Sequence, residues 1–238
     1  TVLLICVLAL VLVGILMVYS ASGASPAASA GLKRHLVFVA TGLTLMYIAS
    51  RFDYHHLSDP IIFRSIVIVS MVMLVLVLVP GVGVRVDGAQ RWLRVAGFQF
   101  QPSEIAKVAL ILLLAAKLAA NQDRMKDFWS GFLPPMVIAA VFASMVVLER
   151  DLGMPIVLMT VAMAMILMAG ARMRHLAIAI VPCIALGTAL ILTFPHRVRR
   201  LVAFADPWQY ANDEGYQLIQ SLMGFARGGV WGTGPGAG

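Results

Sequence analysis

The sequence predicts an all-α protein, a polytopic bundle of transmembrane helices, and three observations support this fold class. Of its 238 residues, 61% are hydrophobic and only 12% are charged, which is about half the charged share of a soluble domain. Several apolar runs approach the ~20 residues that a helix needs to cross a bilayer. Backbone groups inside a bilayer must satisfy one another, so apolar runs of this length are expected to be helices.

Seven apolar runs, bounded by charged or turn-forming residues, are the predicted spans. They cover residues 2–20, 35–50, 61–80, 104–120, 129–148, 154–170 and 175–194. No charged segment precedes the first run, so we interpret it as a helix of the bundle and not as a signal peptide. The chain is therefore divided into a helix bundle over 1–194 and a loop over 195–238 that contains an amphipathic helix and is cut short.

Basic residues occur in the links on both sides of the predicted bundle. Numbered along the chain, the odd links and the helix starts beside them hold 11 Lys and Arg residues, and the even links hold 7. The seven are Arg51, Arg64, Lys117, Arg124, Lys126, Arg172 and Arg174. By the positive-inside rule, the count alone would place the odd links in the cytoplasm. Because a cluster of arginines can also be a binding site, the count leaves the orientation open.

The link between the third and fourth spans contains Arg91 and ends in a predicted helix start. Pro102 ends an extended segment, and Ser103 is the predicted N-cap residue. Glu104 and Lys107 are three residues apart on the helix that follows, so they share a face and are expected to pair. Two interpretations stay open: an ion pair that only locks the helix end, or a charged pocket at the membrane surface that includes Arg91.

Two further segments carry polar residues beside spans. The turn that contains Asp151 packs three charges between the fifth and sixth spans, either as a solvated turn or with its carboxylate directed at Lys107 or an arginine of the same face. After the seventh span, a basic run contains Arg200, and residues 216–226 have the spacing of an amphipathic interfacial helix. The glycines over 228–234 permit close backbone approach. No Gly-Lys-Ser/Thr follows them, which excludes a nucleotide-binding P-loop.

Six ordered motifs resemble the SEDS family (shape, elongation, division, sporulation), whose members include FtsW, RodA and SpoVE. The motifs are Gly88-x-Gln90-Arg91-Trp92, Gln101-Pro102-Ser103-Glu104-x-x-Lys107, Asp151-Leu152-Gly153, Arg200-x-x-x-Phe204-x-Asp206-Pro207, Gly215-Tyr216-Gln217-x-x-Gln220-Ser221 and Gly228-Gly229-x-x-Gly232-x-Gly234. The resemblance covers the whole chain, and residues 17–22 at the end of the first span favour the FtsW-like members.

The resemblance implies a ten-helix fold in the bacterial inner membrane, with a cytoplasmic N-terminus and external odd links. It implies a peptidoglycan glycosyltransferase that polymerises lipid II for cell division or cell shape. Two alternatives remain: a lipid II flippase, or a membrane scaffold for a penicillin-binding protein. The flippase needs a polar path across the membrane. Arg64 and Lys117 lie near span ends, and this scarcity of intramembrane charge favours the enzyme.

The resemblance also assigns roles to residues of the matched motifs. The cations implied for the pyrophosphate side of the substrate are Arg91, Lys107 and Arg200. The carboxylates implied to orient them are Glu104 and Asp151. The candidate sugar or backbone contacts are Gln217, Gln220 and Ser221, and the remaining predicted substrate-binding residues are Trp92, Gln101 and Ser103.

The family's proposed catalytic aspartate is expected beyond Gly238, so the chain alone is expected to be inactive. Pro235 departs from the family's usual glycine loop. The implied partners are an undecaprenyl-pyrophosphate-linked substrate, a class B penicillin-binding protein and the membrane, with no nucleic acid. No metal site or cofactor is predicted, and a divalent cation stays open. Cys6 and Cys183 lie in apolar runs and are expected to pack there.

Overall fold

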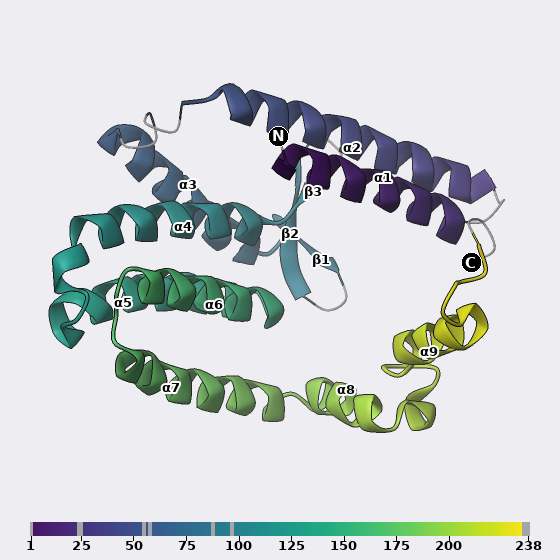
Figure 1. The fold of residues 1–238 in the computed structure, drawn as a ribbon. Coiled ribbons are helices and arrows are strands. Elements are labelled where there is room, and N and C mark those ends of the chain that lie inside the picture. Colours follow the sequence, from purple (N-terminus) through teal and green to yellow (C-terminus); the bar gives the residue numbers. More distant parts are fainter. Residues whose placement is uncertain are drawn as a thin grey trace. The chain divides into compact units, whose positions relative to one another are not determined.

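The computed structural model describes residues 2–22, 26–53, 56, 59–86, 89–95 and 98–234. All seven predicted spans are confirmed as helices (Figure 1). They are α1 (Val2–Ser22), α2 (Pro26–Arg51), α3 (Pro60–Leu78), α4 (Pro102–Ala120), α5 (Leu133–Leu148), α6 (Gly153–Met168) and α7 (Met173–Leu192). By its contacts the chain forms two compact units, one over Tyr54–Leu190 and the other over Thr1–Asp53 with Ile191–Gly238.

Five helices of the described chain are long and apolar enough to cross a membrane. Their apolar stretches are Val2–Ser20, Ala30–Arg51, Ile61–Leu78, Phe128–Leu148 and Met173–Leu192. The remaining two predicted spans are helical but less suited to crossing. Helix α6 has 16 residues, and α4 carries Glu104, Lys107 and Lys117 among its 19. The prediction of about seven spans is therefore approximate, whereas the helical multi-pass architecture is confirmed.

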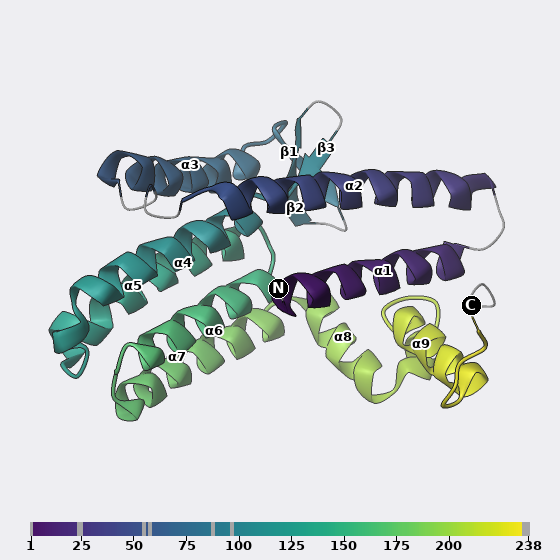
Figure 2. The ribbon, with the colours of Figure 1, turned by 45° about the horizontal axis from the view of Figure 1, so that its top comes forward.

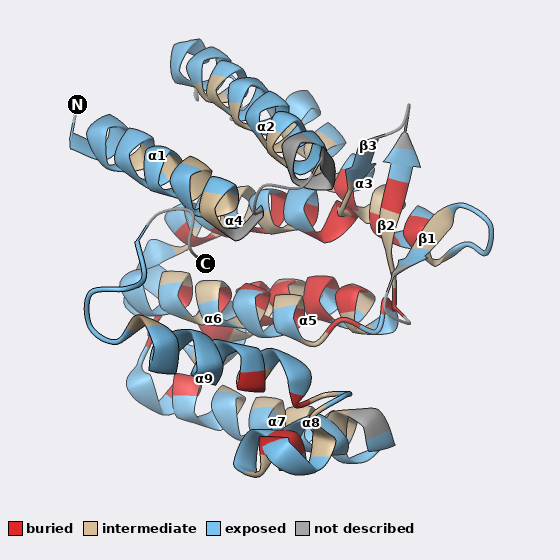
Figure 3. Ribbon diagram, turned by 90° about the vertical axis from the view of Figure 1, so that its right-hand side faces the viewer, coloured by how far each residue is buried: buried red, intermediate tan, exposed pale blue. Residues whose placement is uncertain are grey.

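Small residues allow close packing of α4, α5 and α6 in the unit over 54–190. Ala109 of α4, Ala139 of α5 and Ala162 of α6 are fully buried, and such residues let helices approach closely inside a membrane. Larger apolar side chains, among them Leu110 and Leu158, fill the space between the helices. In Figure 3 the buried positions concentrate on α4, α5 and strand β2. This packed core fixes the ends of the helices relative to one another.

The link between α3 and α4 forms a three-stranded antiparallel sheet that the sequence analysis did not predict. Its strands are β1 (Gly83–Val86), β2 (Ala89–Val95) and β3 (Phe98–Phe100), in the order β1-β2-β3. Figure 2 shows the strands at the end of α3, beside the start of α4. The Gln90 side-chain amide donates to the Val79 carbonyl at 3.0 Å, which ties β2 to the end of α3.

A local signal for this sheet is present in the sequence. Val84-Arg85-Val86 alternates apolar and polar residues and leads into Asp87-Gly88, a dipeptide typical of two-residue hairpin turns. The composition of the link, rich in Gly and Arg, is equally typical of a loop, so this signal alone does not predict a sheet. Asp87 and Gly88 themselves lie outside the described residues.

The other unit contains α1 packed on α2, and a helical segment after α7. That segment consists of α8 (Pro195–Ala205), the short turn η4 (Pro207–Tyr210) and α9 (Tyr216–Gly228). Helix α9 confirms the helix predicted over 216–226, whereas α8 was not predicted as a helix. Gly215 starts α9 where an added Cβ would lie 2.3 Å from the Pro207 carbonyl oxygen, so only glycine fits the chain reversal there.

We expect Gly131→Ala to destabilise the unit over 54–190. A Cβ at this position would lie 2.0 Å from the Arg124 carbonyl oxygen and 2.8 Å from the Met125 Cα. Both are backbone atoms, so relief requires a backbone shift, which costs about 1–3 kcal/mol. The thermal unfolding midpoint of the detergent-solubilised protein should fall by several degrees. Gly187→Ala in α7 is the control, because nothing lies within 4 Å of its added Cβ. Equal midpoints for the two variants would contradict the prediction.

Candidate functional site

The carboxylate of Asp151, in the turn between α5 and α6, joins three elements of the fold. Its Oδ1 accepts hydrogen bonds from the backbone N–H groups of Gly153 (2.9 Å) and Met154 (3.3 Å), in the first turn of α6. Its Oδ2 accepts from Arg91 Nη1 at 3.3 Å and from Gln101 Nε2 at 3.2 Å. Arg91 comes from strand β2 and Gln101 immediately precedes α4. One side chain therefore holds the sheet against the starts of α4 and α6.

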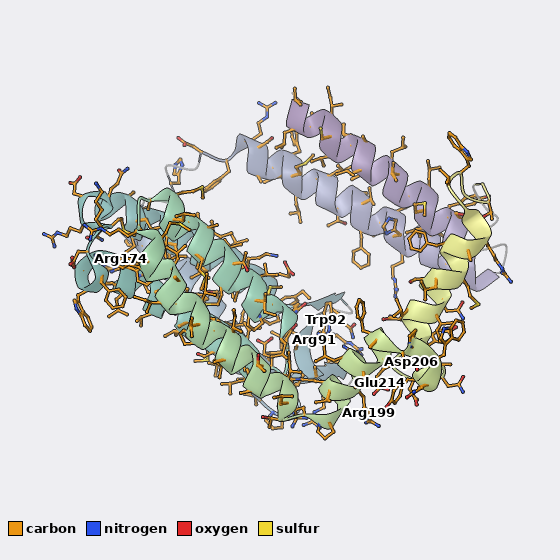
Figure 4. The ribbon with its side chains drawn as sticks, turned by 60° about the horizontal axis from the view of Figure 1, so that its bottom comes forward. Arg91, Trp92, Arg174, Arg199, Asp206 and Glu214 are labelled. Carbon is orange, nitrogen blue, oxygen red and sulfur yellow. The ribbon has the colours of Figure 1, made fainter. Side chains whose placement is uncertain are left out.

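The contact between Arg91 and Asp151 decides between the two interpretations of the α5–α6 turn. The two side chains are 30% and 11% exposed, so the ion pair is partly withdrawn from water and is stronger than an ordinary surface pair. The carboxylate is directed at an arginine of the same face, as one interpretation held, and not into solvent. Figure 4 shows Arg91 and Trp92 beside one another on the sheet.

The predicted pair on α4 is also present. Lys107 Nζ lies 2.6 Å from Glu104 Oε2, and the two side chains are 29% and 54% exposed. A pair this open to water contributes at most about 1 kcal/mol to stability. Its effect is geometric, because the carboxylate restrains the ammonium group on the first turns of the helix that follows Gln101. Each of the two cations, Arg91 and Lys107, thus has its own carboxylate.

The prediction that Ser103 caps α4 is wrong. The helix begins at Pro102, and Gln101 occupies the N-cap position with an extended backbone. Proline suits the first helical position because its fixed φ matches the helix and its missing N–H would be unpaired there anyway. The helix therefore starts two residues earlier than predicted, which places Ser103 inside its first turn. The Ser103 side chain is fully buried.

Several buried polar atoms of this region have no hydrogen-bond partner within the described part of the chain. They are Arg91 Nε, Trp92 Nε1, Ser103 Oγ and both carboxyl oxygens of Glu149. An unpartnered buried group costs about 1–3 kcal/mol, and such groups in a native fold call for an explanation such as a functional role. All of them belong to Arg91 or to residues within two positions of Arg91, Gln101 or Asp151, so we take this region as the candidate site, with unused donors on the sheet and at the start of α4.

Glu149 belongs to this region, and sequence reasoning missed it. The residue is only 1% exposed and lies just beyond the span that ends at Leu148. The pKa of Glu149 is raised from 4.5 to about 8, mainly by burial and then by the negative charge of Asp151, while Arg91 opposes the rise. The buried face of α5 runs through Phe142 and Val146 toward Glu149. Because α5 is apolar on all sides, the sequence does not show which side of the helix is buried and therefore does not show that Glu149 is buried with it.

Four predicted site residues lie in the other unit. Arg200 is exposed on α8, and Gln217, Gln220 and Ser221 are exposed on α9. Ser221 Oγ donates to the Gln217 carbonyl at 2.9 Å. Arg199, the neighbour of Arg200, pairs with a carboxylate. Arg199 Nε lies 3.5 Å from Glu214 Oε1, which links α8 to the turn before α9 (Figure 4).

The contacts described above do not test whether the predicted residues bind substrate, so their substrate-binding roles stay predictions. Gly88 of the first matched motif, Pro235 and Gly238 lie outside the described residues. In the described ranges, no group of three or more His, Cys, Asp or Glu side chains could hold a metal ion. The predictions about cofactors and divalent cations stay predictions as well.

The fold and the polar region at its helix ends define a multi-pass membrane protein. The chain belongs to the FtsW/RodA/SpoVE family of cell cycle proteins, whose sequence profile matches residues 1–238. This membership confirms the resemblance drawn from the six motifs.

Named relatives agree with the FtsW-like assignment. A probable peptidoglycan glycosyltransferase FtsW from Geobacter sp. (strain M18) is 38% identical over 233 residues, which are 94% of this chain and 62% of that protein. A protein of the same name from Coxiella burnetii is 34% identical over 98% of this chain and 63% of its own. The chain thus spans a little under two thirds of the length of these relatives.

Solved structures show the same fold. A chain from a structure described as a peptidoglycan synthase complex that coordinates polymerisation and crosslinking has a TM-score of 0.71 at 24% identity, covering 94% of this chain and 65% of that one. The rod shape determining protein RodA of Thermus thermophilus has a TM-score of 0.57 at 23% identity, covering 80% of this chain and 58% of its own.

The raised pKa of Glu149 predicts a pH-dependent stability. Between pH 4.5 and about 8 the folded protein keeps this proton while the unfolded chain has lost it. The free energy of unfolding should therefore fall as the pH rises through this window, by roughly 5 kcal/mol at most, and level off above it. Glu149→Gln keeps a neutral side chain of the same shape, so it should remove the decline and unfold at a higher temperature than the parent above pH 8.

The measurement is the thermal unfolding midpoint in detergent from pH 5 to pH 9. Glu104→Gln is the matched control, because it removes a carboxylate whose side chain is 54% exposed, and it should keep the decline. A Glu149→Gln profile parallel to that of the parent protein would contradict the assignment.

Proposed function

We propose that the protein carrying this chain is a peptidoglycan glycosyltransferase that polymerises lipid II in the cell division machinery. The observation that carries the proposal is the Arg91 guanidinium, held by Asp151 beside buried donors with no partner among the described residues. Guanidinium groups and fixed N–H and O–H donors suit the oxygens of a diphosphate. The names of the relatives support the same activity.

In this reaction a sugar hydroxyl of one lipid II molecule attacks the anomeric carbon of another, and undecaprenyl pyrophosphate leaves. Negative charge builds on the departing pyrophosphate, and cations fixed in advance stabilise it without reorganisation. Arg91 and Lys107 supply this positive charge, and Asp151 and Glu104 keep the two cations in place. The base that takes the hydroxyl proton is not among these residues.

The remaining predicted residues stay candidate substrate contacts, each within its own unit. Trp92 Nε1 on strand β2, next to Arg91, and Ser103 Oγ in the first turn of α4, after Gln101, are buried donors. Arg200, Gln217, Gln220 and Ser221 are proposed to contact the sugar or pyrophosphate from α8 and α9. The proposed partner is a class B penicillin-binding protein. Support comes from the similarly folded chain of the peptidoglycan synthase complex.

We place the protein in the bacterial inner membrane with its N-terminus in the cytoplasm. The sheet and the α5–α6 turn then lie on the outer face, where lipid II displays its sugars for polymerisation. The positive-inside rule disfavours basic residues on the outer face. Binding of an anionic substrate explains why basic residues are nevertheless found there.

Loss of either proposed cation should abolish glycan polymerisation. Arg91→Ala and Lys107→Ala in the full-length protein should each lower the rate by about 100-fold or more, because each removes charge aimed at the leaving group. The assay is the formation of glycan strands from purified lipid II in the presence of the partner. Arg94→Ala is the control, since Arg94 is exposed on the same strand β2. Parental rates in both test variants would refute the site.

The proposed orientation predicts which residues an impermeant maleimide reaches. Gln99 of β3 and Gln122 after α4 are both exposed, and each can be changed to cysteine in a background that lacks Cys6 and Cys183. Gln99→Cys should be labelled from outside intact spheroplasts, and Gln122→Cys only after permeabilisation. The reverse pattern would put the sheet in the cytosol and remove the proposed mechanism.

A further inference from the structure

A second polar region lies at the other ends of α4, α5 and α6. There the α4–α5 connection and the α6–α7 turn line a cavity of about 460 Å³. Figure 4 labels Arg174 at this end of the unit, with Arg91 and Trp92 at the other. The cavity shares no residue with the candidate functional site, so its occupant is a separate question.

The cavity carries unneutralised positive charge. Its basic side chains are Arg124, Lys126, Arg172 and Arg174, against the two carboxylates of Asp123 and Asp127. None of these four cations forms an ion pair with a carboxylate of the described chain. Asp127 is already engaged, because its Oδ2 accepts hydrogen bonds from the backbone N–H and the hydroxyl of Ser130, both at 2.8 Å. The Ser130 backbone N–H is the main cause that lowers the pKa of Asp127.

His175 adds a buried donor to the same cavity. The residue is 3% exposed, and its ring is held by Phe128 (ring centroids 5.3 Å apart) and Phe132 (5.5 Å). Arg174 Nε donates to His175 Nε2 at 3.4 Å, so Nε2 is the acceptor of the ring and Nδ1 is its donor. That Nδ1 is buried with no partner among the described residues. An acceptor-bearing ligand would satisfy it.

The cavity lies at the level where spans begin. The apolar stretch that includes α5 starts at Phe128, five residues before the helix itself, and that of α7 starts at Met173. Residues on both sides of these points line the cavity. Trp129, next to Phe128, is 74% exposed, and tryptophan is typical of the boundary between lipid tails and headgroups. The ligands most concentrated at this depth are the headgroups themselves.

We propose that this cavity binds a phosphate group, supplied by the headgroup of an anionic phospholipid. Arginine guanidinium groups match phosphate oxygens in pairs, and the buried Nδ1–H of His175 donates one more hydrogen bond. Basic pockets between membrane helices are known to hold anionic headgroups. The proposal goes beyond the glycosyltransferase activity and does not depend on it.

The test measures lipid binding to the full-length protein by native mass spectrometry in detergent, with phosphatidylglycerol and phosphatidylcholine as probes. The parent should bind phosphatidylglycerol saturably and in preference to phosphatidylcholine. The double variant Arg172→Gln/Arg174→Gln should raise the dissociation constant for phosphatidylglycerol about 30-fold, the effect of removing two charges near a membrane surface. Both arginines are exposed, so the variant should fold, which its unfolding midpoint in phosphatidylcholine checks.

Arg64→Gln/Lys117→Gln is the matched control. It removes the same charge from the same unit, and neither residue lines the cavity, so its affinity for phosphatidylglycerol should stay parental. Equal affinities in the parent and both double variants would overturn the proposal.

A second arm uses inorganic phosphate without lipid and measures the unfolding midpoint. The proposal expects at most weak protection by free phosphate. Strong protection that the Arg172→Gln/Arg174→Gln variant loses, without any preference for phosphatidylglycerol, would support the phosphate site. It would at the same time overturn the headgroup as the source of the phosphate.

Discussion

The arrangement of the candidate site depends on one carboxylate. The two oxygens of Asp151 accept four hydrogen bonds, from the first turn of α6, from Gln101 before α4 and from Arg91 of β2. A guanidinium on a short sheet would otherwise have many rotamers, and fixing it before substrate arrives removes that entropic cost from binding. The ion pair between Arg91 and Asp151 therefore serves mainly to orient the guanidinium, because its contribution to stability is modest.

Asp151 and Glu149 belong to the same turn but differ in their hydrogen bonding. Asp151 accepts from a cation, an amide and two backbone N–H groups, whereas Glu149 is buried with no hydrogen-bond partner among the described residues. Burial beside a like charge favours the protonated form of Glu149. A neutral Glu149 leaves Arg91 to Asp151 and avoids a second buried negative charge. This division keeps a single anion at the centre of the site.

The unit over 54–190 is apolar in its middle and polar at both ends. Alanines such as Ala109, Ala139 and Ala162 allow the helices to pack closely, and larger apolar side chains fill the rest of the core. Ionisable groups inside a membrane are costly and are retained where they act. Glu149 follows the end of α5 and His175 lies in the first turn of α7; both are buried, each with atoms that the described chain leaves unpartnered. Each end of the unit therefore has buried polar atoms that are not used in its internal hydrogen bonds.

The sequence by itself determined the seven helices and the pairing of Glu104 with Lys107, because apolar run length and helical spacing act over a few residues. It also located the segments that contain Arg91, Gln101 and Asp151. Only the tertiary structure decided that Asp151 binds Arg91, 60 residues away, and not Lys107. It likewise paired the strands of the sheet, moved Ser103 inside α4 and buried Glu149. These outcomes depend on how helix ends meet, and an apolar helix does not show in its sequence which side will face its neighbours.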